Sequence, residues 1–279
     1  SVVLIDTMFN STQSVQQGVT SLHQLPTGSY STRAALAFRG GSLFETRQFS
    51  ATPVLLRHPS GDVLLDAGFG RDFEQHLAML PRFRRSPHEL GVAAVDQLAA
   101  AGYDLDGLAG ILLTHSHWDH VSGIADLDVP ILITADELRY AADARDDRVF
   151  TAVSAGRTVR TYEFDGGPFE GFPFSHDLYG DGAIVIVPAP GHTTGSVIVF
   201  VTTVNAQRFA FIGDLAWQLE GVERNVDRPL LMRMLADSDR ARVRTDLAAV
   251  GRLASRWKIV PAHDPRAFAG IPTLDPDQR

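Results

Sequence analysis

A cluster at positions 115–120 limits what this chain can fold into more than any other feature. The apolar segment Gly110–Thr114 predicts a strand buried on both faces, and it runs directly into His-Ser-His-Trp-Asp-His. In an extended turn His115 and His117 project to the same side, whereas Asp119 and His120 follow a change of direction. Such groups repel one another or lose hydration when crowded, unless a cation organises them. The cluster therefore predicts one loop that supplies two neighbouring metal positions.

Three further candidate ligands follow predicted strands later in the chain. His192 lies between strands at 184–187 and 197–201, Asp214 follows a strand at 209–212, and His263 follows a strand at 258–260. Taken singly, each has a structural alternative, as a turn residue, a helix cap and a solvated loop histidine respectively. Together with the cluster they make five imidazoles and two carboxylates. Because the chain has no cysteine, its nitrogen and hard oxygen ligands suit zinc, iron(II), manganese or cobalt.

Charge and hydropathy exclude several classes of function. The 279 residues carry 25 basic and 33 acidic side chains, for a net charge of −8, whereas proteins that bind nucleic acid gather Lys and Arg. The best apolar runs are only of strand length, so no membrane span and no nucleic-acid partner are predicted. We expect a soluble protein. The chain starts at Ser1 rather than Met, which leaves a cytoplasmic location and export after signal removal both open.

The order of predicted elements indicates a mixed α/β (α+β) fold in a single domain, residues 1–279, because no repeat or linker interrupts the chain. An extended loop is expected at 10–31 and helices at 86–102, 136–142 and 239–256. Strands are expected at 2–5, 34–38, 53–57, 63–66, 110–114, 131–134, 158–164, 184–187, 197–201, 209–212 and 258–260. Strands in each half with helices between them favour two sheets packed face to face and covered by helices.

The seven candidate ligands, in this order along the chain, resemble the metallo-β-lactamase superfamily. The resemblance runs from Val54-Leu55-Leu56 and Leu64-Leu65-Asp66-Ala67-Gly68 to His263. It implies a four-layer αβ/βα sandwich and a dinuclear site with two divalent metal ions, zinc above all. By this resemblance, His115, His117 and His192 hold the first metal. Asp119, His120 and His263 hold the second, and Asp214 bridges the two.

Within this family the flanking residues favour a lactonase similar to the N-acyl homoserine lactonases. His117 stands where the di-iron oxygen-reducing branch has an acidic residue, and Asp214 stands where the β-lactamases themselves usually have Cys or Ser. A glyoxalase II-like thioesterase is the alternative enzyme, and a non-catalytic metal-binding protein is a further one. The homoserine lactonases commonly place Tyr three residues after the bridging Asp. Here that position is Trp217, which is either a substrate contact or a packed wall residue.

The mechanism expected from this resemblance is attack of a metal-bridging hydroxide on the carbonyl of a small-molecule ester or lactone. Asp119 is the candidate to hold the hydroxide and later to protonate the leaving oxygen. Segments 166–182 and 218–237 are rich in aromatic and apolar residues, so each is either a wall of the substrate pocket or part of the core. The sequence leaves the metal identity, the substrate and the oligomeric state open.

Overall fold

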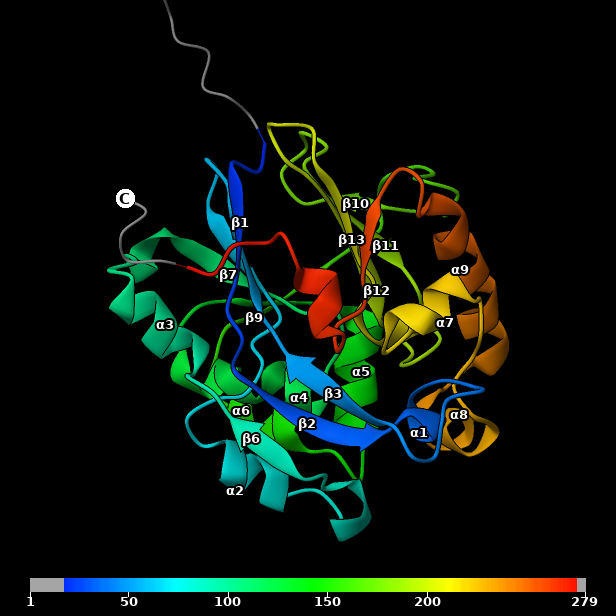
Figure 1. The fold of residues 1–279 in the computed structure, drawn as a ribbon. Helices are drawn as coiled ribbons and strands as arrows, with labels where there is room; N and C mark the ends of the chain where they lie inside the picture. The colour runs from blue at the N-terminus through cyan, green and yellow to red at the C-terminus, as the bar shows by residue number, and fades with distance from the viewer. Residues whose placement is uncertain (1–17, 275–279) are drawn as a thin grey trace, which may run out of the picture.

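Two large β-sheets and one small sheet make up the framework of the computed structural model, which describes residues 18–274 (Figure 1). The first large sheet has the order β1 (Ser21–Gln24), β4 (Val54–Arg57), β5 (Asp62–Leu65), β7 (Leu108–Leu112), β8 (Ile131–Thr134), β9 (Val159–Tyr162). The second has the order β10 (His176–Asp177), β11 (Ile184–Pro188), β12 (Val197–Thr202), β13 (Arg208–Phe211), β14 (Lys258–Val260). The small sheet joins β3 (Thr46–Ala51), β2 (Gly28–Arg33) and β6 (His88–Leu90).

Helices lie between and beyond these strands. The α-helices are α1 (Ala34–Ala37), α2 (Phe73–Ala78), α3 (Ala94–Ala100), α4 (Trp118–Val121), α5 (Ala135–Asp143), α6 (Val149–Val153), α7 (Leu219–Glu223), α8 (Leu230–Ala236) and α9 (Arg240–Leu253). Short 3₁₀ helices are η1 (Arg82–Arg84), η2 (Leu105–Gly107), η3 (Ser122–Asp126), η4 (Gly213–Leu215) and η5 (Pro265–Phe268). Among residues 18–274, no helix combines the length and the apolar character needed to cross a bilayer.

The two large sheets face each other across a shared apolar layer. In β5, Val63 and Leu65 point toward the second sheet, where they join a cluster that includes Val199 and Phe211, whereas Leu64 points the opposite way. This alternation follows from the two-residue period of a strand. The centre of the protein is therefore a dry layer between two sheets.

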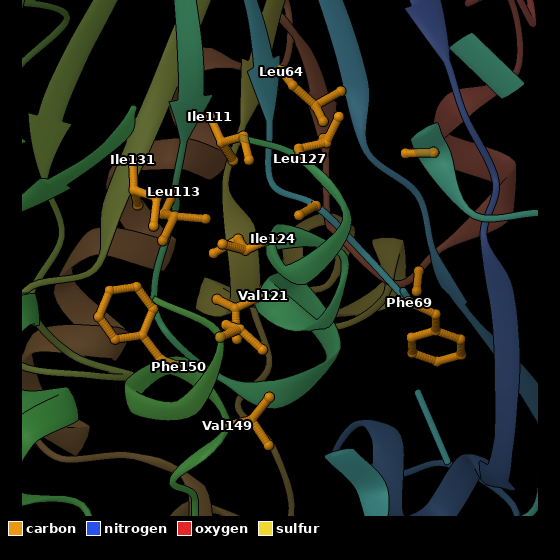
Figure 2. Close-up of a cluster of buried hydrophobic side chains, with 14 of the residues drawn as sticks. Leu64, Phe69, Ile111, Leu113, Val121, Ile124, Leu127, Ile131, Val149 and Phe150 are labelled. Atoms are coloured by element: carbon orange, nitrogen blue, oxygen red, sulfur yellow. The ribbon is translucent and has the colours of Figure 1, made fainter. Parts of the chain in front are cut away.

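Helices cover the outer face of each sheet. Figure 2 shows Ile111 and Ile131 of the first sheet packed with Val121 and Phe150 from the helical side. On the second sheet, α9 contributes an apolar stripe that includes Leu247 and packs against residues of β12 and β13. The order helices, sheet, sheet, helices confirms the predicted mixed α/β four-layer sandwich.

Most of the predicted strands and helices are found within one to three residues of their expected ends, but the N-terminal region differs. Segment 34–38 was predicted as a strand and forms α1, because its alanines favour a helical turn that buries Ala34 and Ala37. Segment 10–31 was predicted as a loop, yet β1 and most of β2 lie in it. Their polar residues become strands because neighbouring strands supply the backbone partners. The strand predicted at 2–5 lies outside the described residues.

The helix predicted from Ser86 is also wrong in its first half. Residues 88–90 form β6, in which His88 pairs with Tyr30, and the helix begins only at Ala94. The cap pattern at Ser86 and Pro87 reflects only the local preference for a helix, and backbone pairing with β2 overrides that preference. This β6–β2 pairing matters for the site because β2 carries Tyr30.

Glu137 in α5 ties together two loops that carry candidate ligands. Its Oε1 accepts hydrogen bonds from Ser116 N and Oγ at 2.7 and 2.6 Å, and its Oε2 accepts from Thr193 Oγ1 and Gly195 N at 2.6 and 3.1 Å. A Cβ on Gly195 would lie 2.1 Å from Glu137 N, so only glycine allows this approach. Burial raises the pKa of Glu137, but these four donors each favour the ionised form. The buried carboxylate holds the loops of His115 and His192 in register.

We expect Glu137→Gln to destabilise the fold by about 2–4 kcal/mol, because the new amide N–H₂ would face two hydrogen-bond donors where the carboxylate had four acceptor contacts. Urea denaturation followed by circular dichroism measures this change. Asp136→Asn, at an exposed position of the same helix, is the matched control and should alter stability by less than about 0.5 kcal/mol. Equal stability of the two variants would contradict this role of Glu137.

Candidate metal centre

The structure brings all seven predicted ligands together at one edge of the two sheets. Their potential ligand atoms form two groups, and within each group these atoms lie within 4.8 Å of one another. The first group is His115, His117, His192 and Asp214, and the second is Asp119, His120 and His263. All seven side chains are buried.

Strand direction explains why residues so far apart in the chain meet here. β5, β7 and β8 are parallel, as are β13 and β14, so the loops after their carboxyl ends lie at the same edge. His115 follows β7, Asp214 follows β13 and His263 follows β14. The turn between β11 and β12 adds His192.

Asp214 lies between the two groups and offers one carboxylate oxygen to each. Its Oδ2 is 3.3 Å from His192 Nε2 and 3.8 Å from His115 Nε2. Its Oδ1 is 2.9 Å from His263 Nε2 and 3.2 Å from His120 Nε2. A carboxylate in this position is able to bridge two cations.

Each of the five imidazoles is oriented by an oxygen atom on its outer side. The outer nitrogens of His115, His117, His120, His192 and His263 lie 2.8–3.2 Å from Thr114 Oγ1, Tyr140 Oη, Asp66 Oδ2, Asp237 Oδ1 and Ser50 O, respectively. When the outer nitrogen carries the proton, the inner nitrogen of a neutral ring has only a lone pair to offer. The orienting oxygens therefore point five lone pairs toward the centre of the site.

These inner atoms fit a cation better than they fit one another. His117 Nδ1 and His192 Nε2 are 2.9 Å apart, and His120 Nε2 and His263 Nε2 are 3.3 Å apart. Among the described residues, His115 Nε2 and Asp214 Oδ1 are buried without a hydrogen-bond partner. Facing lone pairs and an orphaned carboxylate oxygen are costly when buried, and a divalent cation relieves both. The donor set of imidazole nitrogen and carboxylate oxygen suits zinc or a similar divalent metal.

The pKa shifts of His115, His117 and Asp214 agree with this arrangement, whereas nearby carboxylates outweigh burial and raise the pKa of His120 and of His263. Burial lowers the pKa of His115 and of His117 well below that of free imidazole, so both rings are neutral and keep their lone pairs. Burial acts to raise the pKa of Asp214, but His263, His120 and His115 outweigh it and hold this pKa well below its usual range. Asp214 is therefore ionised, as a ligand must be.

Asp66 was part of the segment that carried the family resemblance, but it was not among the predicted site residues. It follows β5 and contacts His120 Nδ1 through Oδ2 at 2.8 Å, and its Oδ1 accepts from Thr114 N at 2.8 Å. Its φ of +56° is rare for a residue other than glycine. A polar residue directly after a buried strand was the signal that could have identified it.

Tyr30 is a second site residue that the sequence did not reveal. It lies in β2, where a loop was predicted, and its hydroxyl donates to Asp119 Oδ2 at 2.9 Å. Its ring packs against Phe49, Trp118 and His263 with centroid distances of 5.2, 5.6 and 5.6 Å. Nothing in the sequence around Tyr30 indicates this contact, because it depends on how the small sheet sits over the site.

Trp217 contacts the centre directly. Its Nε1 donates to Asp214 Oδ2 at 2.9 Å, and the guanidinium of Arg228 lies 4.3 Å from the centre of its ring. Arg228 is itself buried, donating to Asp237 Oδ1 at 2.7 Å and to the backbone oxygen of Asp214. Trp217 and Arg228 together hold Asp214 through its side chain and its main chain.

A cavity of about 260 Å³ opens beside the two groups. Its lining residues are Tyr30, Thr32, Leu36, Phe49, Phe83, Arg84, Ser86, Trp118, Asp146, Trp217, Met232, Leu235 and Ala236. Tyr30 and Trp217 both line it and bond to site carboxylates, so the cavity adjoins the candidate metal ligands. Arg84, the cation among the lining residues, lies 3.2 Å from Asp146, which leaves a mainly apolar wall.

Of the two segments predicted as pocket walls or core, one contributes to this cavity. Met232 and Leu235 of segment 218–237 line it. The pocket interpretation of segment 166–182 is wrong for this cavity, because Phe169 and Phe172 pack instead on the outer face of the second sheet. In the same segment, Tyr179 stacks on His58.

Comparison with known proteins places these features in a family. The family model described as the metallo-beta-lactamase superfamily matches residues 46–263. A probable metallo-hydrolase of Mycobacterium tuberculosis is 30% identical over 233 residues, covering 77% of this chain and 74% of that protein. An N-acyl homoserine lactonase of Agrobacterium fabrum is 23% identical over 232 residues, covering 78% of this chain and 82% of the lactonase.

The fold is similar to that of solved lactonase structures. An N-acyl homoserine lactone hydrolase, solved with N-hexanoyl-L-homoserine at its catalytic metal centre, superposes with a TM-score of 0.73 at 17% identity. The match covers 92% of this chain and 98% of the other. The predicted resemblance is thus confirmed. Because the family model spans residues 46–263 and a relative at 30% identity covers 77% of the chain, the protein belongs to the metallo-beta-lactamase superfamily and is a metal-dependent hydrolase.

Proposed function

We propose that this protein opens a lactone or a related carboxylic ester with the help of two divalent metal ions. The observation that carries the proposal is the pair of ligand groups that share Asp214 beside an apolar cavity. A single metal site would not explain seven converging ligands. A purely structural metal would not explain why the site adjoins a cavity of about 260 Å³.

We assign His115, His117 and His192 to the first metal and Asp119, His120 and His263 to the second, with Asp214 between them. Zinc is the favoured metal, and iron(II), manganese and cobalt suit the same ligands. Divalent cations held here would lower the pKa of a bound water and polarise a carbonyl oxygen.

Asp119 and Tyr30 are the groups of this chain best placed to handle a proton. Asp119 Oδ2 lies 3.4 Å from His263 Nε2 and accepts a hydrogen bond from the Tyr30 hydroxyl. That bond fixes the direction of the carboxylate while the ring of Tyr30 lines the cavity. Asp119 would accept the proton that the attacking water loses and would then deliver the same proton to the leaving oxygen.

The lining of the cavity favours an uncharged substrate with an apolar part. Aromatic and aliphatic side chains such as Phe49, Trp217 and Leu235 predominate, and Arg84 is paired with Asp146. The relatives named as N-acyl homoserine lactonases support a lactone in particular. Trp217 has no second hydrogen available for substrate, because its single N–H is directed to Asp214.

A glyoxalase II-like thioesterase remains the second candidate, and its anionic glutathione substrate would need free cations near the site. The arginines that follow Asp214 are engaged elsewhere: Arg228 with Asp237, Arg233 with Asp227, and Arg224 over the ring of Phe38. A non-catalytic metal-binding protein would need neither the cavity nor the Tyr30–Asp119 bond. The geometry therefore supports the lactonase over both alternatives.

Metal analysis and hydrolysis of an N-acyl lactone test the core of the proposal. We expect about two equivalents of divalent metal per chain. Asp119→Ala and His192→Ala should each lower kcat/KM by at least about 100-fold, because each removes a proposed ligand and Asp119 also handles the proton. His176→Ala, a histidine paired with Asp165 away from the site, is the control and should retain activity. Less than one equivalent of metal, or undiminished hydrolysis in both variants, would sink the proposal.

A direct comparison of substrates separates the two enzyme candidates. On protein of defined metal content, kcat/KM for an N-acyl lactone should exceed that for a glutathione thioester by at least about 10-fold, because Arg84 in the cavity wall is paired with Asp146 and the arginines that follow Asp214 are engaged elsewhere. Faster turnover of the thioester would favour the glyoxalase II-like alternative instead. Metal bound in full with no turnover of lactone, ester or thioester would favour the non-catalytic protein.

Tyr30→Phe tests the positioning of Asp119. We expect kcat for lactone hydrolysis to fall about 10–100-fold with little change in KM, because the ring stays in the cavity wall while the bond to the Asp119 carboxylate is lost. Tyr103→Phe is the matched control, since its hydroxyl bonds to Asp62 outside the site. A rise in KM with unchanged kcat would show that Tyr30 contacts substrate only and does not orient Asp119.

A further inference from the structure

An exposed apolar surface extends outward from the mouth of the cavity, and the proposed hydrolysis does not explain it. Its members, which we call the apolar rim, are Leu36, Leu43, Phe44, Phe83, Leu230, Leu231, Met234 and Leu235. Phe44 is 93% exposed and Phe83 is 78% exposed, values that are unusual for aromatic side chains. Contiguous exposed apolar surface of this kind marks a site of interaction.

Three segments of the chain form the apolar rim, and the structure joins them. Leu36, Phe83 and Leu235 all line the same cavity, so α1, η1 and α8 meet at its mouth. Leu43 and Phe44 belong to the turn after α1, which folds back through the bond from Ala35 N to Ser42 O. The start of α8 lies near the end of α1, where Arg39 N donates to Asp227 O, as the two helices in Figure 1 indicate.

Helix α8 has the composition of a core helix but no buried residue. Its sequence is Leu-Leu-Met-Arg-Met-Leu-Ala, and the described residues 18–274 bury none of these side chains. Four of its side chains are each about 60% exposed, namely Leu230, Leu231, Met234 and Leu235. A helix with this pattern is suited to lie on an apolar or interfacial surface.

Arginines flank the apolar rim in a protein that is acidic as a whole. Arg33 and Arg39 bracket α1, and Arg82 and Arg85 bracket Phe83. All four are exposed, and none has a carboxylate oxygen within 4.0 Å among residues 18–274. Arg33 and Arg85 donate to the uncharged backbone oxygens of Phe44, Leu80 and Ala78, so their positive charge is not neutralised. Cations without a carboxylate partner beside exposed aromatic and aliphatic side chains match a surface that is negatively charged outside and apolar beneath.

We propose that the apolar rim and its four arginines dock the protein on an anionic phospholipid bilayer. Phe44, Phe83 and the exposed leucines of α8 enter the boundary between headgroups and acyl chains, while Arg33, Arg39, Arg82 and Arg85 contact lipid phosphates. The mouth of the cavity then faces the bilayer. Amphiphilic substrate dissolved in the membrane reaches the site without crossing bulk water.

A second copy of the chain is a poorer match for this surface. In a two-fold dimer built on the apolar rim, the same patch meets itself, so the four arginines of each copy, none with a carboxylate partner among residues 18–274, would approach those of the other. Such an interface would need free carboxylates opposite them, whereas Glu45 and Asp146, which lie beside the rim, are already paired with Arg47 and Arg84. An anionic bilayer supplies the missing negative charge.

Vesicle flotation tests the docking directly. We expect the metal-loaded protein to float with vesicles of phosphatidylglycerol and phosphatidylcholine, less with pure phosphatidylcholine, and progressively less as salt rises. Phe44→Ser/Leu231→Ser and Arg39→Ala/Arg82→Ala should each weaken binding by about 10-fold or more, since each cationic or apolar contact contributes on this scale. Leu105→Ser and Arg160→Ala, exposed residues outside the rim, are the matched controls and should bind as the parent does.

The outcomes are separable from those of the proposed function, because vesicle binding needs no turnover. Phe44 and Leu231 do not line the cavity, so hydrolysis of a short water-soluble lactone should be unchanged in that double variant. Absence of binding to the anionic vesicles, or equal binding by parent and both double variants, would overturn the proposal. A dimer seen by sedimentation velocity and dissociated by Phe44→Ser/Leu231→Ser would also overturn it and assign the rim to a second copy.

Discussion

Five buried imidazoles point lone pairs at one buried carboxylate, and the edge of the two sheets is built around that convergence. Each ring is held from outside by an oxygen atom, such as Asp66 behind His120 or Ser50 behind His263. Without a cation, the inner nitrogens 2.9 and 3.3 Å apart would face one another at a cost in desolvation and repulsion. Such an arrangement is favourable when a bound metal, rather than packing of the fold alone, supplies the stabilising free energy. The site therefore lowers the stability of the fold, and other contacts must offset this loss.

Glu137 shows how that cost is met. Its carboxylate belongs to neither group of candidate ligands, yet it accepts four hydrogen bonds from the loops that carry His115 and His192. The motif around Glu137 resembles an ordinary helix start, since Thr134 caps Glu137 N at 3.1 Å. The Glu137 side chain does not cap its own helix but connects two distant loops. A buried, fully satisfied polar network of this kind fixes ring orientations more firmly than apolar packing does.

The convergence of the candidate metal ligands could be predicted from sequence because strand ends and residue chemistry are local properties. His115, Asp214 and His263 each follow an apolar run, and parallel strands bring such ends to one edge. Tyr30 could not be found in this way. Its contact with Asp119 depends on β2, whose polar residues resemble a loop and become a strand only through pairing with β3 and β6. Local propensity gave the wrong element wherever backbone pairing with distant segments decided the structure, as at 88–90.

The same small sheet links the chemistry of the site to its surroundings. β2 supplies Tyr30, which contacts Asp119, and leads directly into α1, whose Leu36 lies in the cavity wall and in the apolar rim. β3 supplies Phe49, which stacks on His263 with nearly parallel rings and also lines the cavity. The two large sheets thus determine where the candidate metal ligands lie, while the small sheet and α8 supply walls of the cavity beside them. Most of the residues that line the cavity come from elements outside the sandwich. The shape of the cavity can therefore change with little effect on the candidate metal ligands.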